Sequence, residues 1–417
     1  MSQYGLNTLT ASFPALRHRN FRLFWIGQCL SLIGPWMQNI GQAWLVLELT
    51  HSALKLSLIT MVQFLPMMFL SLPLGTLIDK IPKKKMLIFT QTAMMVLAFV
   101  LATLTYFKVV QYWHILILSL LLGIVNTLDM PTRQSYMPEI VGREDLMNAV
   151  ALNSSIYNLA RIIGPAIAGF MIGWMGIAVC FYLNGLSFIA VIIGLMMINA
   201  PSIVVGKIDS GIIKDVIREA WEGLEYIFRK GALLRPLLLM AFLAVFVMNY
   251  NNIIPIFAQQ NLGMDASGYG LLMTVMGVGS FIGALTVAVR HKQGPKIAYQ
   301  LAGAIGSSFF LIILGITLNI WLIWLLLFII GFCSTLFTAM INSTLQLNSD
   351  DHMRGRVMSI YSLVFVGFIP LGSLYSGFLM EYFGAPGCMI ISGIIGTIAS
   401  ITVISLRNKK QAAPQAA

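Results

Sequence analysis

The chain has 417 residues, of which 58% are hydrophobic and 10% are charged, and its formal net charge at pH 7 is +11. A soluble protein of this length could not bury so much apolar surface, so the composition excludes that class. Apolar runs of 18 or more residues recur along the chain, and each is long enough to cross a bilayer as a helix. Because these runs are continuous rather than alternating, we expect an all-α polytopic membrane protein.

Twelve apolar runs are expected to form membrane-spanning helices. The first is too long for the hydrophobic region of a cleaved signal peptide, so we expect it to remain as a span. The runs are approximately 22–48, 55–78, 86–107, 113–134, 147–172, 176–199, 234–259, 268–289, 297–318, 321–344, 356–381 and 386–407. They predict an N-terminal six-helix half at 1–199, a cytoplasmic linker at 200–233, a C-terminal six-helix half at 234–407 and a cytoplasmic tail at 408–417.

The basic residues orient these spans. All 26 lysines and arginines except Lys55, Lys108 and Arg161 lie in the termini and connections of one side. The positive-inside rule makes that side cytoplasmic, so we expect both termini in the cytoplasm and the protein in the cell membrane. The positive net charge therefore requires no nucleic-acid partner.

The linker contains a second kind of helix. Within GIIKDVIREAWEGLEYIFRK, apolar residues recur at helical spacing between charged ones; they are Ile213, Ile217, Trp221, Leu224 and Phe228. This pattern predicts an amphipathic helix on the cytoplasmic membrane surface. A regulatory or partner-binding helix is the alternative.

Signs of metal binding or enzymatic chemistry are absent from the sequence. The four cysteines, Cys29, Cys180, Cys333 and Cys388, all fall within apolar runs and lack metal-ligand spacing, as expected of small buried hydrophobic residues. No GxxxxGK[ST] loop indicates an ATPase, and no paired carboxylates or His/Cys cluster stand out in the spans. We expect no metal site and no enzymatic activity.

Polar side chains recur at steps of three and four in several predicted spans, which marks faces turned away from lipid. These faces either line a substrate cavity or form hydrogen bonds between helices. The candidates for the cavity are Gln28, Gln38, Gln42, Asn126, Asn158, Arg161, Asn249, Asn252, Thr338 and Asn342.

Arg161 lies deep in the fifth span, on one face with Asn158 and Pro165. A charge at this depth is costly and marks a partner or a transport pathway. Arg161 could contact an acidic or polar group of a substrate. The alternative is a structural or gating ion pair with Asp129 on the fourth span.

Two carboxylates are candidates for proton coupling, because a carboxylate in low-dielectric surroundings can take up and release a proton. Glu48 lies near the outer end of the first span, and Asp129 lies toward the inner end of the fourth. Glu48 also fits an interfacial acid beside His51.

The connection between spans 2 and 3 reads GTLIDKIPKKK, from Gly75 to Lys85. It resembles the major facilitator superfamily motif Gly-x-x-x-Asp-Arg/Lys-x-Gly-Arg/Lys-Arg/Lys, with Pro82 at the second glycine. The resemblance implies a cytoplasmic latch in which Asp79 faces helix 11 and a basic residue near Lys83 pairs with an acid on helix 4. The latch residues it implies are Gly75, Asp79, Lys80, Lys83 and Lys84, with Asp129 as the helix-4 candidate. The matching bend of the second half, GALTVAVRHKQGPK, lacks the acid.

Further stretches resemble the drug:proton antiporter-3 group of that superfamily, the transmembrane secretion effectors, which include enterobactin exporters and macrolide-efflux proteins. They are FRLFWIGQCLSLIGPWMQNIGQAWLVLELT, MPTRQSYMPEIV, NLARIIGPAIAG and RGRVMSIYSLVFVGFIPLGSLYSG. Gly164, Pro165 and Gly169 resemble the Gly-Pro motif of exporters. The resemblance covers the whole chain and implies the twelve-helix major facilitator fold, with alternating access.

Composition and resemblance together predict a secondary active exporter of hydrophobic or amphipathic small molecules, such as drugs or siderophore-like metabolites. The family implies proton antiport, with the proton gradient as energy source and no cofactor, by a monomer in the lipid bilayer. The alternatives are a lysophospholipid flippase of the same fold and a non-transporting membrane protein.

Overall fold

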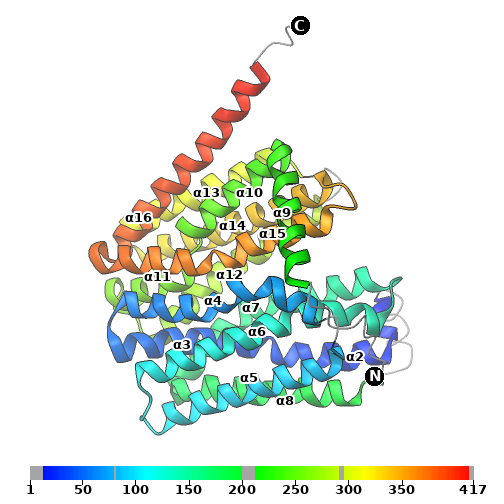
Figure 1. Cartoon of the computed structure of the whole chain (residues 1–417). Coiled ribbons are helices and arrows are strands. Elements are labelled where there is room, and N and C mark those ends of the chain that lie inside the picture. Colours follow the sequence, from blue (N-terminus) through cyan, green and yellow to red (C-terminus); the bar gives the residue numbers. More distant parts are fainter. Residues whose placement is uncertain (1–12, 79–80, 200–211, 291–294, 413–417) are drawn as a thin grey trace. The chain divides into compact units, whose positions relative to one another are not determined.

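The computed structural model describes residues 13–78, 81–199, 212–290 and 295–412, and within these ranges all regular structure is helical (Figure 1). The first six spans are built from α2 Arg19–Ser31, α3 Ile33–Thr50, α4 Ala53–Ile78, α5 Lys83–Tyr106, α6 Tyr112–Val141, α7 Leu146–Met175 and α8 Ile177–Met197, preceded by the short 3₁₀ helix η1 Pro14–Arg17. The remainder comprises α9 Ile212–Arg229, α10 Gly231–Phe246, α11 Tyr250–Ile256, the π-helical turn η2 Phe257–Asn261, α12 Ala266–Val289, α13 Ile297–Ile316, α14 Ile320–Asn348, α15 Arg354–Gly367 and α16 Ile369–Ala412.

The twelve predicted spans are confirmed. Ten helical segments of the described chain are long and apolar enough to cross a membrane. One of them, Arg354–Val403, covers the last two predicted spans, which meet at Gly384, where φ is 68°. The remaining span, the first, is divided between α2 and α3.

Proline explains two of the helix breaks. Pro35 has no N–H for the carbonyl of Ser31, and α2 ends at that residue. Pro370 likewise leaves the carbonyl of Val366 without its helical partner, and α15 ends one residue later. The break after α10 has another cause, because the Asn249 side chain donates to the carbonyl oxygen of Val245 at 2.7 Å.

The chain divides into two compact units. Unit 1 comprises Met1–Leu45 and Phe69–Val216, and unit 2 comprises Val46–Met68 and Ile217–Ala417. The segment Val46–Met68, from the end of α3 into α4, packs with unit 2, where a Cβ placed on Gly377 of α16 would meet the side chain of Ser57. The division of the sequence into six-helix halves on either side of residues 200–233 stays a prediction.

In unit 1, α5 packs side by side with α8 and also against α6, while α2 packs against α8 (Figure 1). A cluster of buried apolar residues joins α2 to the end of α6, and it includes Phe21, Phe24, Tyr136 and Met137. This packing fixes the depth at which polar side chains of α2, α5 and α6 meet.

In unit 2, α14 packs against both α12 and α13. Two glycines allow the close approach of α12 and α14: a Cβ on Gly279 would overlap the carbonyl oxygen of Phe328, and one on Gly331 would overlap that of Met276. Small residues at helix contacts are the usual way in which membrane helices come close.

The predicted amphipathic helix of the linker is α9, and it docks on the start of α15. Gly223 is buried against Arg356 and Ile360, and Arg356 forms a 2.7 Å ion pair with Glu222. Trp221 and Phe228, on another face of α9, are exposed. Its position on a membrane surface stays a prediction.

The four cysteines are free thiols. Cys180, Cys333 and Cys388 are buried, as expected, whereas Cys29 is only partly buried.

Candidate functional site

Lys83, at the start of α5, forms a buried ion pair with an acid of helix α6, as the latch motif implies, but the acid is Glu139. Lys83 Nζ lies 2.5 Å from Glu139 Oε1, and the two side chains are 8% and 7% exposed. The expectation that Asp129 would be this partner is therefore wrong. Asp79 and Lys80 lie outside the described residues, as do the surroundings of Gly75.

The register of α5 and α6 explains the correction. The two helices pack against each other, and Lys83 opens α5 while α6 ends at Val141. Asp129 lies ten residues before Glu139, which is about 15 Å along a helix and well out of reach of Lys83. The neighbouring Lys84 donates instead to the carbonyl oxygen of Ile198 at 2.7 Å, just after the end of α8.

Asp129 is the centre of a second buried polar group in unit 1, and it is only 3% exposed. Its carboxylate accepts from Thr90 Oγ1 at 2.6 Å and from Gln91 Nε2 at 2.8 Å, both on α5. Arg133, one helical turn along α6, pairs with the other carboxylate oxygen and also donates to Gln28 Oε1 on α2. These bonds tie α2, α5 and α6 together within the span.

The partners of Asp129 also bear on the ion pair with Arg161 that the sequence suggests as an alternative. The cation paired with Asp129 is Arg133, at the i,i+4 spacing that brings side chains together on one helix face. Arg161 lies over the ring of Trp36, 6.0 Å from its centroid. The structure therefore pairs Asp129 with Arg133 and places Arg161 over the ring of Trp36.

Trp36 of α3 packs against one face of α7. Tyr157 meets its ring edge-on at 6.0 Å between centroids, and Arg161 lies one helical turn further along. Gly164 follows, and a Cβ on it would overlap the side chain of Trp36. Trp36 and Arg161 are partly buried, and Tyr157 is exposed. We call Trp36, Tyr157 and Arg161 the aromatic–cation cluster.

The glycines and proline of the exporter-like motif pack inside unit 1. Gly164, Pro165 and Gly169 are buried in α7. Gly164 leaves room for the side chain of Trp36, so this residue of the motif helps to position the aromatic–cation cluster. The sequence did not single out Trp36, because an aromatic residue in an apolar run resembles any lipid-facing one.

Several predicted cavity residues of unit 1 form hydrogen bonds between helices instead of presenting free polar groups. Gln38 accepts from Asn184 Nδ2 of α8, and Gln42 donates to Ser119 Oγ of α6 at 3.2 Å. Both glutamines are buried. Asn126 is partly buried, and Asn158 donates to the carbonyl oxygen of Ser154 in its own helix at 2.8 Å.

The predicted cavity residues of unit 2 also form hydrogen bonds, either within their own helix or to a neighbouring helix. Asn252 accepts from Thr60 Oγ1 of α4 at 2.7 Å, and Thr338 donates to the carbonyl oxygen of Ser334 at 3.0 Å. Asn342 accepts from Gln346 one turn along α14 at 2.7 Å. Asn249, as described above, bonds its own helix end. A role for any of these residues in binding substrate stays a prediction.

The two proton-coupling candidates differ in setting. Glu48 is exposed two residues before the end of α3, whereas Asp129 is buried in the network with Arg133. Among the described residues, no group of three or more His, Cys, Asp or Glu side chains is arranged to hold a metal ion.

Comparison with known proteins identifies the family. A family model described as transmembrane secretion effector matches residues 10–416. The chain therefore belongs to this family of major facilitator superfamily transporters and is a multi-pass membrane protein.

Two relatives and one solved structure illustrate the likeness. The staphyloferrin A transporter of Staphylococcus aureus is 28% identical over 403 residues, which cover 93% of this chain and 96% of the relative. The multidrug efflux pump Tap of Mycolicibacterium fortuitum is 23% identical over 350 residues, covering 82% and 84%. A bacterial homologue of the human lysosomal transporter Spinster, in an inward-facing and unoccupied conformation, matches with a TM-score of 0.75 at 12% identity, covering 94% and 97%. The last match shows the fold alone.

Proposed function

We propose that this protein is a secondary active exporter of hydrophobic or amphipathic small molecules, which it exchanges for protons by alternating access. Membership of the transmembrane secretion effector family supports export. The relatives named a staphyloferrin A transporter and a multidrug efflux pump support small organic substrates. We further propose that it works as a monomer in the plasma membrane with both termini in the cytoplasm, as the distribution of basic residues indicates.

The aromatic–cation cluster is the observation that supports the proposed class of substrate. Trp36 and Tyr157 offer apolar ring surface, and Arg161 offers a planar guanidinium at 6.0 Å from the Trp36 ring. An apolar surface with one directional cationic group suits a molecule that combines an apolar body with a carboxylate or another hydrogen-bond acceptor. A small inorganic ion would leave the aromatic surface unused.

The test reconstitutes the full chain in proteoliposomes with an imposed pH gradient. A fluorescent amphipathic drug and the internal pH are followed together. Drug movement against its gradient with opposite proton flow is the expected result. Drug and proton movements that are both absent, across cationic, neutral and anionic drugs, would overturn the proposed activity.

Arg161→Ala and Trp36→Ala test the cluster in the same assay. Removing a hydrogen bond to a charged group costs about 1.5–3 kcal/mol, so we expect Arg161→Ala to raise the substrate KM about tenfold or more. Trp36→Ala removes apolar ring surface and should also raise the substrate KM. Arg143→Ala is the matched control, because Arg143 is an exposed arginine between α6 and α7. If both cluster variants transport like the native protein for all three drug classes, the cluster does not bind substrate.

A further inference from the structure

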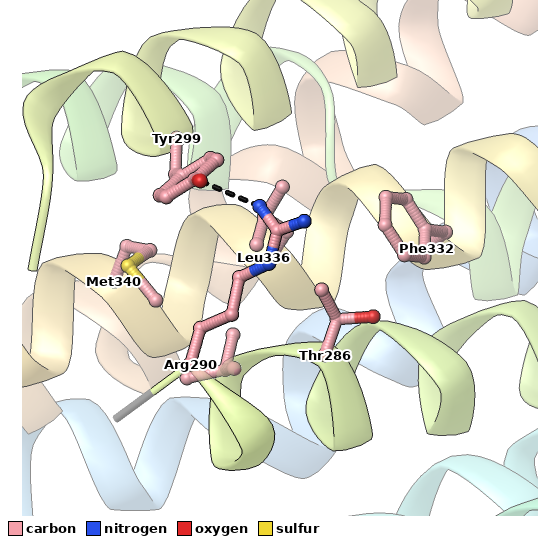
Figure 2. Close-up of a pocket in the computed structure, with 7 residues that line it drawn as sticks. Thr286, Arg290, Tyr299, Phe332, Leu336 and Met340 are labelled. Carbon is pink, nitrogen blue, oxygen red and sulfur yellow. Dashed lines mark hydrogen bonds between the residues drawn. The ribbon is translucent and has the colours of Figure 1, made fainter. Parts of the chain in front are cut away.

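A groove on unit 2 lies outside everything assigned above. It opens over α14, with α12 on one side and α13 on the other, and encloses a cavity of about 190 Å³ (Figure 2). Its floor consists of Phe332, Leu336 and Met340, which recur every four residues on one face of α14. Thr286 and Arg290 of α12 and its C-cap line one wall, and Tyr299 of α13 lines the other.

The packing of the three helices creates this groove. α14 packs closely against both α12 and α13, and a Cβ on Gly283 would contact the backbone of Phe332. The side chains of the floor are therefore left between two helical walls. Leu336 and Met340 are buried, and Phe332 is partly buried, so the floor is an apolar surface below the molecular boundary.

A cationic group reaches across the groove from the α12 side to α13. Arg290 Nη1 donates to the hydroxyl oxygen of Tyr299 at 2.5 Å, and the guanidinium lies 5.3 Å from the centroid of the tyrosine ring (Figure 2). Arg290 is exposed. A guanidinium has five N–H donors, and the hydrogen bond to Tyr299 uses one of them. This bond fixes the orientation of Arg290 and leaves donors that can bind an anion.

The charges of these elements select the kind of ligand. The sequence from Ala266 to Asn348, which forms all three helices, contains no aspartate or glutamate. It contains three lysine or arginine residues, Arg290, Lys292 and Lys296, which fall close together in the sequence. An anionic group is therefore favoured beside Arg290, while the apolar floor favours hydrocarbon.

We propose that this groove binds an anionic phospholipid, with a segment of one acyl chain on the Phe332–Leu336–Met340 floor and the phosphate on Arg290. Drug-sized ligands generally occupy pockets of about 300–1,000 Å³. The cavity of about 190 Å³ is smaller and suits part of a chain whose remainder lies in the bilayer. The groove also occupies a different face of α14 from Thr338 and Asn342, which were expected to face the substrate.

The test uses the full chain, delipidated in a neutral detergent, and counts bound lipid by native mass spectrometry. Phosphatidylglycerol, phosphatidylcholine, inorganic phosphate and a neutral alkyl glycoside are added separately. We expect one tightly bound phosphatidylglycerol, about tenfold weaker phosphatidylcholine, and no competition from inorganic phosphate at the same concentration. Arg290→Ala should weaken phosphatidylglycerol binding about tenfold or more, because it removes a charge-assisted bond.

Two variants keep this test decisive. Thr286→Trp places a large side chain at the rim while retaining Arg290, and we expect it to weaken binding as well. Arg143→Ala removes an exposed arginine elsewhere and should bind lipid like the native protein. Equal binding of phosphatidylglycerol by the native protein and Arg290→Ala would overturn the proposal. So would equal affinity for phosphatidylcholine, or displacement of the lipid by inorganic phosphate or by the alkyl glycoside.

Discussion

Units 1 and 2 differ in how deeply their ion pairs are buried. In unit 1, two ion pairs lie within the helix packing: the side chains of Lys83 and Glu139 are 8% and 7% exposed, and those of Arg133 and Asp129 are 18% and 5% exposed. In unit 2, the ion pairs found among the described residues involve α9, the α14–α15 connection or the start of α15. Each of their side chains is at least 31% exposed.

Both units contain close glycine contacts, such as Gly164 on Trp36 in unit 1, but in unit 2 these contacts are not combined with an ion pair buried as deeply as that of Lys83 and Glu139 among the described residues. α12 and α14 approach until the backbone of each occupies the space of a side chain on the other, at Gly279 and Gly331. A buried ion pair tolerates little change, because removing one partner leaves an uncompensated charge in a low-dielectric interior. A glycine contact has no such charge, but it tolerates no added volume. The two units should therefore respond to different substitutions.

The largest effect is expected when the buried pair of unit 1 is broken. Lys83→Met leaves the Glu139 carboxylate buried without its cation, and Glu139 Oε2 already has no hydrogen-bond partner among the described residues. We expect a loss of about 3–5 kcal/mol in the free energy of unfolding. Denaturant unfolding of the purified protein in detergent, followed by tryptophan fluorescence, measures it.

Two controls separate charge from packing. Lys85→Met removes an exposed lysine two residues away and should change the free energy of unfolding by at most about 0.5 kcal/mol. The double variant Lys83→Met/Glu139→Gln removes both charges and should recover most of the loss. A double variant as unstable as Lys83→Met would show that the cost comes from packing rather than from the unpaired carboxylate.

The intermediate effect concerns the glycine contact of unit 2. Gly331→Ala forces a methyl group against the carbonyl oxygen of Met276, so α12 and α14 must separate. Overpacking of this kind costs about 1–3 kcal/mol. The same unfolding measurement detects it.

Gly355→Ala is the matched control for Gly331→Ala. Gly355 lies in α15 with nothing within 4 Å of an added Cβ. Gly355 is the second residue of α15, so this exposed substitution should change the free energy of unfolding by at most about 0.5 kcal/mol. Equal effects of the two substitutions would contradict the close contact of α12 with α14.

The sequence allowed the twelve spans to be predicted because run length and continuous hydrophobicity are local properties. It did not show the partner of Lys83, since two acids lie on the same helix and only the register of α5 against α6 chooses Glu139 over Asp129. The Trp36 contact was missed because its neighbours come from α7, more than 120 residues later. Pro35 and Pro370 were visible signals for the helix breaks that we did not use.

The smallest effect is expected at the exposed ion pair that joins the end of α9 to the connection between α14 and α15. Lys230 Nζ donates to Tyr226 Oη at 2.6 Å and to Asp350 Oδ1 at 2.9 Å. The bond from Lys230, then that from Tyr226, lowers the pKa of Asp350, and the bonds to Tyr226 and Asp350 raise the pKa of Lys230. The stabilisation from Asp350 is therefore present above its unfolded pKa of about 3.9 and is lost as the pH falls through the lower folded pKa. The stabilisation from Lys230 is present below its unfolded pKa of about 10.4 and is lost as the pH rises through its higher folded pKa.

Asp350→Asn should lower Tm between about pH 4 and pH 10 by less than either preceding variant, because exposed pairs contribute little. The difference from the native protein should shrink below about pH 3 and in about 1 M salt, where the pair is protonated or screened. Asp351→Asn is the control, since the side chain of Asp351 is 92% exposed and pairs with nearby Arg354. A Tm difference for Asp350→Asn that is the same at pH 3 and pH 7 would contradict an electrostatic role. The attachment of α9 would then depend on its contacts with the start of α15, where Gly223 packs against Arg356 and Ile360 and Glu222 pairs with Arg356.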